Sequence, residues 1–150
     1  MEFDPILICS IQPHYLLNSL HAITGWISKN PQKASDMVSS LSNEFLGLLK
    51  FSNEKSILVN DEIELCQSHL TIMSNRKLND YQLKTENLDS TKKIPPLIFH
   101  TIIENGIKHE LQGQESPHVS FFIRCDKNNV NEIYTVFCKG SRKVKQQNPD

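Results

Sequence analysis

A histidine directly after a proline is the first feature of this sequence that points to chemistry. Pro13 and His14 fall within an apolar pattern of helical period that runs from about residue 5 to residue 29. A proline inside a helix removes a backbone hydrogen bond and costs about 3 kcal/mol. Two interpretations are open, and spacing favours neither. The proline kinks the helix and exposes or aims His14, or the helix begins near Pro13 and His14 is an ordinary residue of its first turn.

A second group of polar side chains lies in the C-terminal half, where Glu104, Asn105, Lys108 and His109 follow an apolar run. Residues four apart share a helix face, so Asn105 should lie with His109, and Glu104 with Lys108 on the adjacent face. Such a surface either lines a ligand site or faces water. Spacing alone favours water.

Other familiar arrangements of reactive residues are missing from the sequence. His14 and His21 are two helical turns apart, too far to share one metal ion. The sequence has no HExxH, no zinc-type Cys/His spacing, no GxSxG and no Walker loop, and its five glycines form no GxGxxG. No sequence motif therefore predicts a metal-dependent hydrolase, a serine hydrolase or a known type of phosphate-binding loop.

Charge and cysteine content narrow the class of protein. In 150 residues, Lys+Arg 16 and Asp+Glu 17 give a formal net charge of −1, which argues against a generally basic nucleic-acid-binding protein. The basic tail at residues 139–150 lacks aromatic residues that stack on bases, so we expect no nucleic-acid partner. The four cysteines are widely spaced, and we interpret them as reduced thiols, mostly in the core, of a cytoplasmic protein rather than as disulfides. The longest nearly apolar stretch, residues 95–103, is half a membrane span, so no membrane segment is expected in this chain.

Two amphipathic helices are predicted to carry His14, over residues 5–29 and 32–51. Asp4 is the expected N-cap of the first, with Pro5 at its first position. The apolar stripes recur at steps of three and four and consist of Leu16, Leu20, Ile23 and Ile27, then Met37, Leu41, Phe45 and Leu48. The short break at Asn30-Pro31 makes the helices antiparallel neighbours.

This helical hairpin has more apolar surface than two helices can bury. Each stripe has about four large side chains, worth roughly 1.5–3 kcal/mol apiece when fully buried. Two hairpins forming a four-helix bundle would enclose both stripes, so we expect a homodimer through residues 5–51. The alternative is that the hairpin folds back onto the rest of its own chain.

The remaining residues alternate helical and strand patterns, so the predicted fold class is α+β. We expect a helix over 60–77 capped by Asn60, a strand over 81–88, and a helix from Pro95-Pro96 to about residue 111, with Gly113 beyond its end. Strands over 118–125 and 132–138 should be joined by a polar turn at 126–129.

Three sequence blocks form a family pattern when they are taken together. Residues 11–20 contain Pro-His followed by an aromatic residue, Leu and Asn. Residues 58–76 contain an acidic helix start, the run His69-Leu70-Thr71-Ile72, and Arg76. Residues 94–109 begin Ile-Pro-Pro-Leu and end Glu-Asn-Gly-Ile-Lys-His, which is similar to an N box. In order and spacing, residues 5–138 resemble the LytS-type sensor histidine kinases.

The resemblance implies a fold and two domains. Residues 1–54 would be the dimerisation and histidine phosphoacceptor hairpin, and residues 55–150 an incomplete ATP-binding domain of the Bergerat-type α/β sandwich. The implied function is two-component signal transduction, in which ATP with Mg²⁺ phosphorylates His14 and the phosphoryl group passes to an Asp of a response regulator. The resemblance suggests a regulator of the LytTR type. The chain would be the cytoplasmic part of a protein that is membrane-anchored elsewhere.

The resemblance also assigns roles to residues of the second polar group. Asn105 would offer its amide oxygen to Mg²⁺, which prefers oxygen ligands. Glu104 would orient the attacking imidazole or accept its proton, and Lys108 or His109 would contact phosphate.

Several positions depart from the family pattern. Ser10, His21, Leu46, Gly106 and Glu110 replace the usual Gln, Asn, Arg, Ala and Gly. Cys138 stands near the place of the expected Asp or Asn that contacts adenine, and the later glycine-rich motif has no counterpart. The alternative function is therefore a non-catalytic, truncated or degenerate, dimerisation and interaction module that binds ATP weakly or not at all.

Overall fold

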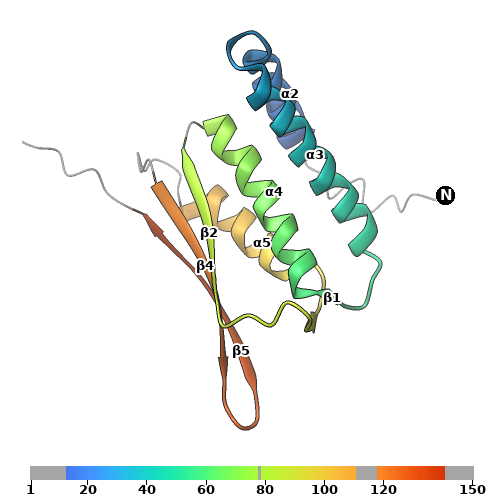
Figure 1. Ribbon diagram of the computed structural model, residues 1–150, viewed down its shortest axis with the longest axis vertical. Coiled ribbons are helices and arrows are strands. Elements are labelled where there is room, and N and C mark those ends of the chain that lie inside the picture. The colour runs from blue at the N-terminus through green and yellow to red at the C-terminus, as the bar shows by residue number, and fades with distance from the viewer. Residues whose placement is uncertain (1–12, 78, 111–117, 141–150) are drawn as a thin grey trace, which may run out of the picture.

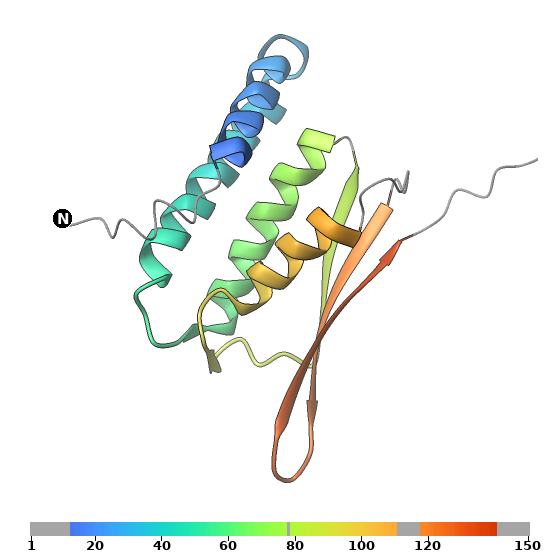
Figure 2. The ribbon, with the colours of Figure 1, turned by 180° about the vertical axis from the view of Figure 1, so that it is seen from behind.

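The computed structural model describes residues 13–77, 79–110 and 118–140, and these form three layers. Figures 1 and 2 show a helical hairpin on one side, a pair of helices in the middle, and a twisted sheet on the other side. The predicted α+β class, a helical hairpin followed by an α/β layer, is confirmed at this level.

The hairpin consists of α2 (Pro13–Lys29) and α3 (Pro31–Phe51). Asn30 caps α3, because its side-chain oxygen accepts a hydrogen bond from the backbone N–H of Lys33 at 3.1 Å, and Pro31 fits the first helical turn. The break at Asn30-Pro31 and the antiparallel pairing are thus as predicted. The expected helix start at Asp4 and Pro5 lies outside the described residues, so the two interpretations of Pro13 both remain.

The hairpin packs against α4 (Val59–Lys77) of its own chain. Ile72 of α4 belongs to the same buried cluster as Ile23, Met37 and Leu41 of the hairpin. The indole N–H of Trp26 donates to the backbone carbonyl of Asn75 at 3.3 Å. The hairpin therefore covers one side of α4, which is the alternative arrangement in the sequence analysis.

Part of the predicted apolar stripe nevertheless remains on the surface. Leu20 and Ile27, which we expected in a helical seam, are 45% and 58% exposed. Leu17 and Val38 are exposed as well. Packing onto α4 thus leaves an apolar outer face on the hairpin.

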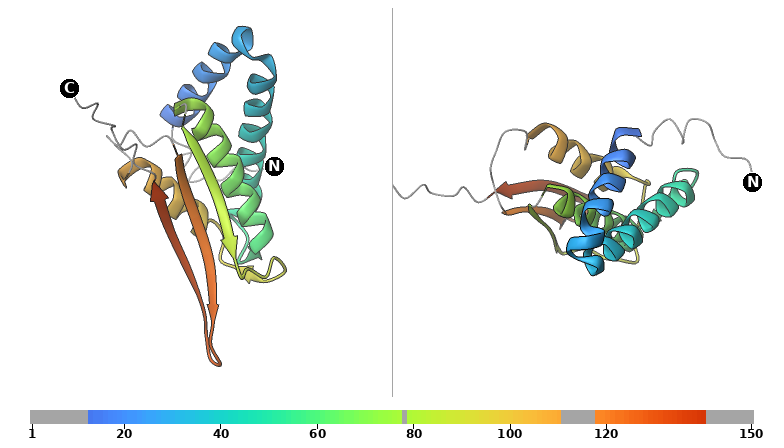
Figure 3. Two further views of the ribbon diagram at one scale, coloured as in Figure 1. Left: turned by 60° about the vertical axis from the view of Figure 1, so that its left-hand side comes forward. Right: turned by 90° about the horizontal axis from the view of Figure 1, so that it is seen from above.

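The main sheet has the strand order β2-β4-β5. Its strands are β2 (Asp80–Glu86), β4 (His118–Lys127) and β5 (Glu132–Gly140). β2 and β4 are parallel, with Tyr81 opposite Val119, and β4 and β5 are antiparallel. Figure 3 shows the far ends of β4 and β5 extending beyond the helices.

The connection from β2 to β4 contains α5 (Ile98–Asn105), which lies beside α4 on one face of the sheet. Alternate residues of β4 point to these helices and are buried: Val119, Phe121, Ile123 and Cys125. They join a core cluster that includes Cys66 and Leu70 of α4 and Phe99 and Ile103 of α5. This core fixes α5 beside α4 on the sheet.

The structure corrects several predicted boundaries. α4 begins at Val59, so Asn60 lies inside the helix and donates to Glu64 rather than capping it. β1 (Ile57–Leu58) and β3 (Lys93–Ile94) form a small antiparallel pair that the sequence pattern did not predict. The strand pair β4–β5 extends further than expected, because the Asn128 side chain accepts from the backbone of Val130 and Asn131 and moves the turn toward residues 128–131.

The helix predicted from Pro95-Pro96 to residue 111 differs at both ends. Leu97 has a left-handed backbone conformation with φ 65°, so α5 starts only at Ile98. After Asn105 the backbone continues as a π-helical turn, η1 (Gly106–Glu110). Gly113 lies outside the described residues. Within the described ranges, no helix is both long and apolar enough to span a membrane.

Candidate functional site

His14 is exposed as the second residue of α2. The next residue, Tyr15, faces inward and packs against both core clusters. The phosphoacceptor proposed by resemblance is therefore open to solvent, while its neighbour joins the hairpin to the interior.

Asn105, the residue expected to bind Mg²⁺, lines a pocket of about 540 Å³ between α5 and the sheet. The lining is mainly apolar and consists of Ile102, Asn105, Gly106, Phe121, Val136, Phe137 and Cys138. This volume is within the usual range for small-molecule sites. Asn105 lines this pocket and is also exposed to solvent, so both sequence-based alternatives for this surface, a ligand site and a solvated face, are compatible with its position.

Gly106 allows the pocket wall to approach the helix end closely. A Cβ at this position would lie 3.3 Å from Cε1 of Phe121, tighter than ordinary van der Waals contact. Gly106 also begins the π-turn, in which the hydrogen-bond spacing changes from four residues to five. The α-helical spacing that placed Asn105 and His109 on one face therefore ends at Asn105.

Glu104 does not lie with Asn105 in this pocket. Its carboxylate is 3.9 Å from Nδ1 of His100, one helical turn earlier on α5. Lys108 is exposed in η1, and His109 is in the same turn, with its side chain outside the described atoms. Of the predicted group, only Asn105 is among the residues that line the pocket, and the partly exposed carboxylate of Glu104 lies beside the buried His100.

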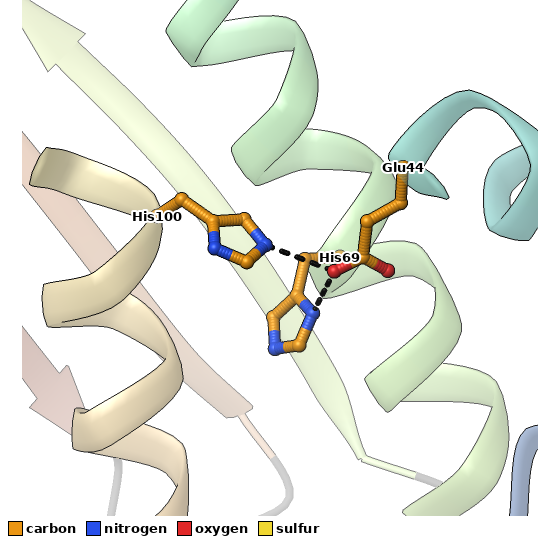
Figure 4. A group of neighbouring side chains, drawn as sticks. All are labelled: Glu44, His69 and His100. Atoms are coloured by element: carbon orange, nitrogen blue, oxygen red, sulfur yellow. Dashed lines mark hydrogen bonds and ion pairs between the residues drawn. The ribbon is translucent and has the colours of Figure 1, made fainter. Parts of the chain in front are cut away.

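A buried polar cluster joins the hairpin to both central helices, and Figure 4 shows it. Nδ1 of His69 on α4 and Nε2 of His100 on α5 lie 2.6 Å and 2.9 Å from the same oxygen, Oε1, of Glu44 on α3. The hydroxyl of Tyr15 donates to the other carboxylate oxygen. All three members of the cluster are at most 5% exposed. We call Glu44, His69 and His100 the interlayer cluster.

The contacts of Glu44 and Tyr15 shift the pKa values of both side chains. Burial by itself raises the pKa of Glu44, but hydrogen bonds from His100, His69 and Tyr15 outweigh it and lower the pKa to about 2. Glu44 is therefore ionised at neutral pH. Burial and the neighbouring Glu44 carboxylate raise the pKa of Tyr15 well above its ordinary value, so Tyr15 remains a neutral donor. The Arg76 guanidinium lies 5.3 Å from the Tyr15 ring centroid.

A second buried carboxylate holds the start of α5. Glu62 of α4 accepts hydrogen bonds from the backbone N–H groups of Leu97 at 2.8 Å and His100 at 3.0 Å. Leu97, at the N-cap position of α5, has no side-chain hydrogen bond to the helix start. Glu62 therefore satisfies two backbone donors that would otherwise have no cap. This contact positions α5, and with it His100, Glu104 and Asn105.

No motif in the sequence predicts the interlayer cluster. Glu44 lies three residues after Leu41 and seven after Met37, on the buried face of α3. His69 and His100 lie within apolar segments. A carboxylate on an apolar helix face is the signal that distant polar partners must exist, because an unpaired buried charge is very costly. The identity of those partners depends on tertiary packing.

Comparison with known proteins identifies the family. A family model described as histidine kinase matches residues 6–81, about half of the chain. The chain belongs to the histidine kinase family. The match includes His14, Glu44 and His69.

Individual relatives support the LytS-type resemblance. The chain is 30% identical over 132 residues to the sensor protein LytS of Enterococcus faecalis, covering 85% of this chain and 22% of that protein. It is 25% identical over 111 residues to a sensor histidine kinase/phosphatase LytS of Staphylococcus aureus, covering 73% and 19%. The chain thus spans about a fifth of the length of these curated relatives. Their names do not favour the non-catalytic alternative.

Proposed function

We propose that this chain contains the phosphoacceptor hairpin and part of the ATP-binding domain of a sensor histidine kinase in two-component signalling. The observation that carries the proposal is that one packed body presents an exposed His14 on α2 and a ligand-sized pocket at Asn105. The family membership supports the same assignment.

His14 is the proposed nucleophile. A neutral imidazole nitrogen attacks the γ-phosphorus of ATP, a nitrogen–phosphorus bond forms, and the bond to the ADP oxygen breaks. The imidazole proton leaves to a base, for which Glu104 is our proposal. Transfer of the phosphoryl group to an Asp of a response regulator then restores His14.

The residues around Asn105 fit a magnesium nucleotide. The amide oxygen of Asn105 is a hard ligand that suits Mg²⁺, and the apolar side chains of Ile102, Phe121 and Val136 suit a purine ring. When bound, the metal neutralises charge on the transferring phosphoryl group. Lys108 and His109 come three and four residues after Asn105, in η1, and we propose that they contact phosphate.

Cys138 also lines this pocket, where the family pattern has an Asp or Asn. A thiol is a much weaker hydrogen-bond partner than a carboxylate or amide. We therefore expect recognition of the adenine edge to be weaker here than in a site that keeps the acid or amide.

The proposed partners follow from the family. A second copy would pair through the exposed apolar face of the hairpin. The receiver domain of a response regulator, for which we propose the LytTR type, would accept the phosphoryl group. We propose that the α/β layer is part of a Bergerat-type sandwich and that the chain is the cytoplasmic part of a membrane-anchored sensor.

Phosphorylation of the chain by a complete LytS-type kinase tests the assignment of His14. With labelled ATP, we expect acid-labile label on the wild-type chain and none on His14→Ala. His21→Ala is the matched control, because His21 is also exposed on α2. Label that persists in His14→Ala, or that disappears in His21→Ala alone, would show that His14 is not the acceptor.

A further inference from the structure

We propose that the interlayer cluster of Glu44, His69 and His100 binds a divalent transition-metal ion of the Zn²⁺ class. One possible ligand atom from each residue lies within 4.8 Å of those of the other two. Figure 4 shows both imidazole rings directed at a single carboxylate oxygen. Among the described residues, this is the group of His, Cys, Asp and Glu side chains whose geometry suits one ion.

The donor set selects the class of ion. Two imidazole nitrogens and one carboxylate oxygen are common ligands of zinc and neighbouring transition metals, whereas Mg²⁺ and Ca²⁺ require mainly oxygen. An ion about 2.0–2.1 Å from each donor would separate neighbouring donors by roughly 3.3 Å. The present separations of 2.6 Å and 2.9 Å must therefore open by less than an ångström.

Two further side chains, Glu104 and Tyr15, lie next to the cluster. Nδ1 of His100 faces the carboxylate of Glu104 at 3.9 Å, while its Nε2 faces Glu44. A carboxylate hydrogen-bonded to a ligating histidine leaves the opposite ring nitrogen available to the metal, and Glu104 would have to approach Nδ1 of His100 by about 1 Å to act in this way. Tyr15 similarly holds the second oxygen of Glu44. Three protein ligands leave a fourth position for water.

The local charge also favours a cation. Glu44 and Glu62 are buried carboxylates, and Glu104 is a third nearby acid. Glu62 accepts hydrogen bonds from backbone N–H groups, and Glu44 from the histidines. The Arg76 guanidinium lies over the Tyr15 ring. A divalent ion would offset buried negative charge that is otherwise stabilised by hydrogen bonds.

Binding would have a mechanical consequence, because the three ligands come from α3, α4 and α5. The ion would fasten the hairpin that carries His14 to the helix that carries Asn105. The site stands on geometry alone and does not depend on the proposed kinase activity.

Zinc titration of the metal-stripped full chain tests this proposal. We expect one Zn²⁺ per chain with submicromolar affinity and an increase in thermal midpoint on binding. Loss of a residue that only hydrogen-bonds to a metal ligand typically weakens metal binding by roughly 10–100-fold. His69→Gln and His100→Gln each remove a ligand itself, so each should weaken zinc binding by more than this. His21→Gln, a change at an exposed histidine outside the cluster, should bind like the wild type.

Two results would overturn the proposal. The first is no saturable zinc binding to the wild-type chain, which would leave the cluster as a hydrogen-bonded network only. The second is equal affinity in the wild type and in folded His69→Gln, with folding checked by circular dichroism. If the glutamine variants do not fold, X-ray absorption of the wild-type zinc complex decides: imidazole and oxygen ligands support the site, and sulfur ligands assign the ion to cysteines.

Discussion

Glu44 is a charged residue in a place where apolar residues are the rule. It lies on the face of α3 that packs against α4, and it is 1% exposed. Its two carboxylate oxygens are fully engaged by His69, His100 and Tyr15. Its ionised form therefore depends on three partners from three other helices.

Glu44→Ala is expected to destabilise the chain by about 3–5 kcal/mol, because it leaves two histidines and a tyrosine hydroxyl buried without their shared partner. Urea denaturation in the presence of EDTA measures this free energy without a contribution from bound metal. Glu54→Ala is the control, because Glu54 is exposed, and it should change stability by no more than about 0.5 kcal/mol. A loss below about 1 kcal/mol for Glu44→Ala would contradict the energetic role of the cluster.

Cys66 should be unreactive in the native chain. Burial raises the pKa of its thiol well above the ordinary value, and the Glu62 and Glu44 carboxylates act in the same direction. Since the thiolate is the nucleophile, alkylation at mildly alkaline pH should spare Cys66 and modify the partly exposed Cys138 faster. Peptide mass spectrometry gives both rates. Equal rates in the native chain would rule out this burial, and in denaturant both residues should react.

At the scale of single elements, two glycines in the hairpin occupy opposite environments. Gly25 of α2 has no atom within 4 Å of the position that a Cβ would take. A Cβ at Gly47 of α3 would lie 2.7 Å from Cδ1 of Leu65 on α4, which is buried. Gly47 therefore sets how closely α3 approaches α4.

These environments predict opposite effects on stability. Gly25→Ala should stabilise the chain by up to about 1 kcal/mol through helix propensity. Gly47→Val should destabilise it by about 1–3 kcal/mol, because the core must move to accept the side chain. Thermal or urea unfolding of the two variants side by side checks this pair. A stabilised Gly47→Val would mean that the two helices are not held at this distance.

The elements that sequence predicted well are those with local signals. The hairpin follows from helical stripes and from Asn30-Pro31, and β4 follows from its alternation of buried and exposed residues. The start of α5 is harder to predict from the sequence, because it depends on the left-handed backbone of Leu97 and on Glu62, 35 residues earlier in the chain. The π-turn at Gly106 has no periodic signature in a segment of this length.

The same distinction applies to the candidate site. Short motifs singled out His14 and Asn105, and the structure places the first on the surface of α2 and the second at a pocket, while their roles stay predictions. The direction of Glu104 and the interlayer cluster required the packing of α3, α4 and α5, which brings together residues 25 and 56 positions apart.

For the whole molecule, the exposed apolar face of the hairpin predicts self-association. Leu17, Leu20 and Ile27 are at most partly covered by α4, and burying them against a second copy would be favourable. Light scattering at tens of micromolar should give a mass near twice 17.2 kDa. Leu20→Glu should give the monomer mass while keeping the fold, because Leu20 is already half exposed.

Val130→Glu is the matched control, since Val130 is 85% exposed at the far tip of the β4–β5 hairpin. This variant should remain dimeric. A wild-type mass of 17.2 kDa, or dissociation by both variants alike, would exclude a specific dimer through this face.

The contact between Trp26 and Asn75 gives the chain a built-in optical probe. Trp26 is the one tryptophan in the sequence, and its indole bridges the hairpin and α4 under the ammonium group of Lys33, 4.1 Å from the ring centroid. Separation of the hairpin from α4 would expose this indole to water and shift its fluorescence to longer wavelength, even if every helix stayed intact. Intrinsic emission therefore reports the docking of the two layers in real time, without any label, as nucleotide, metal or a second chain is added.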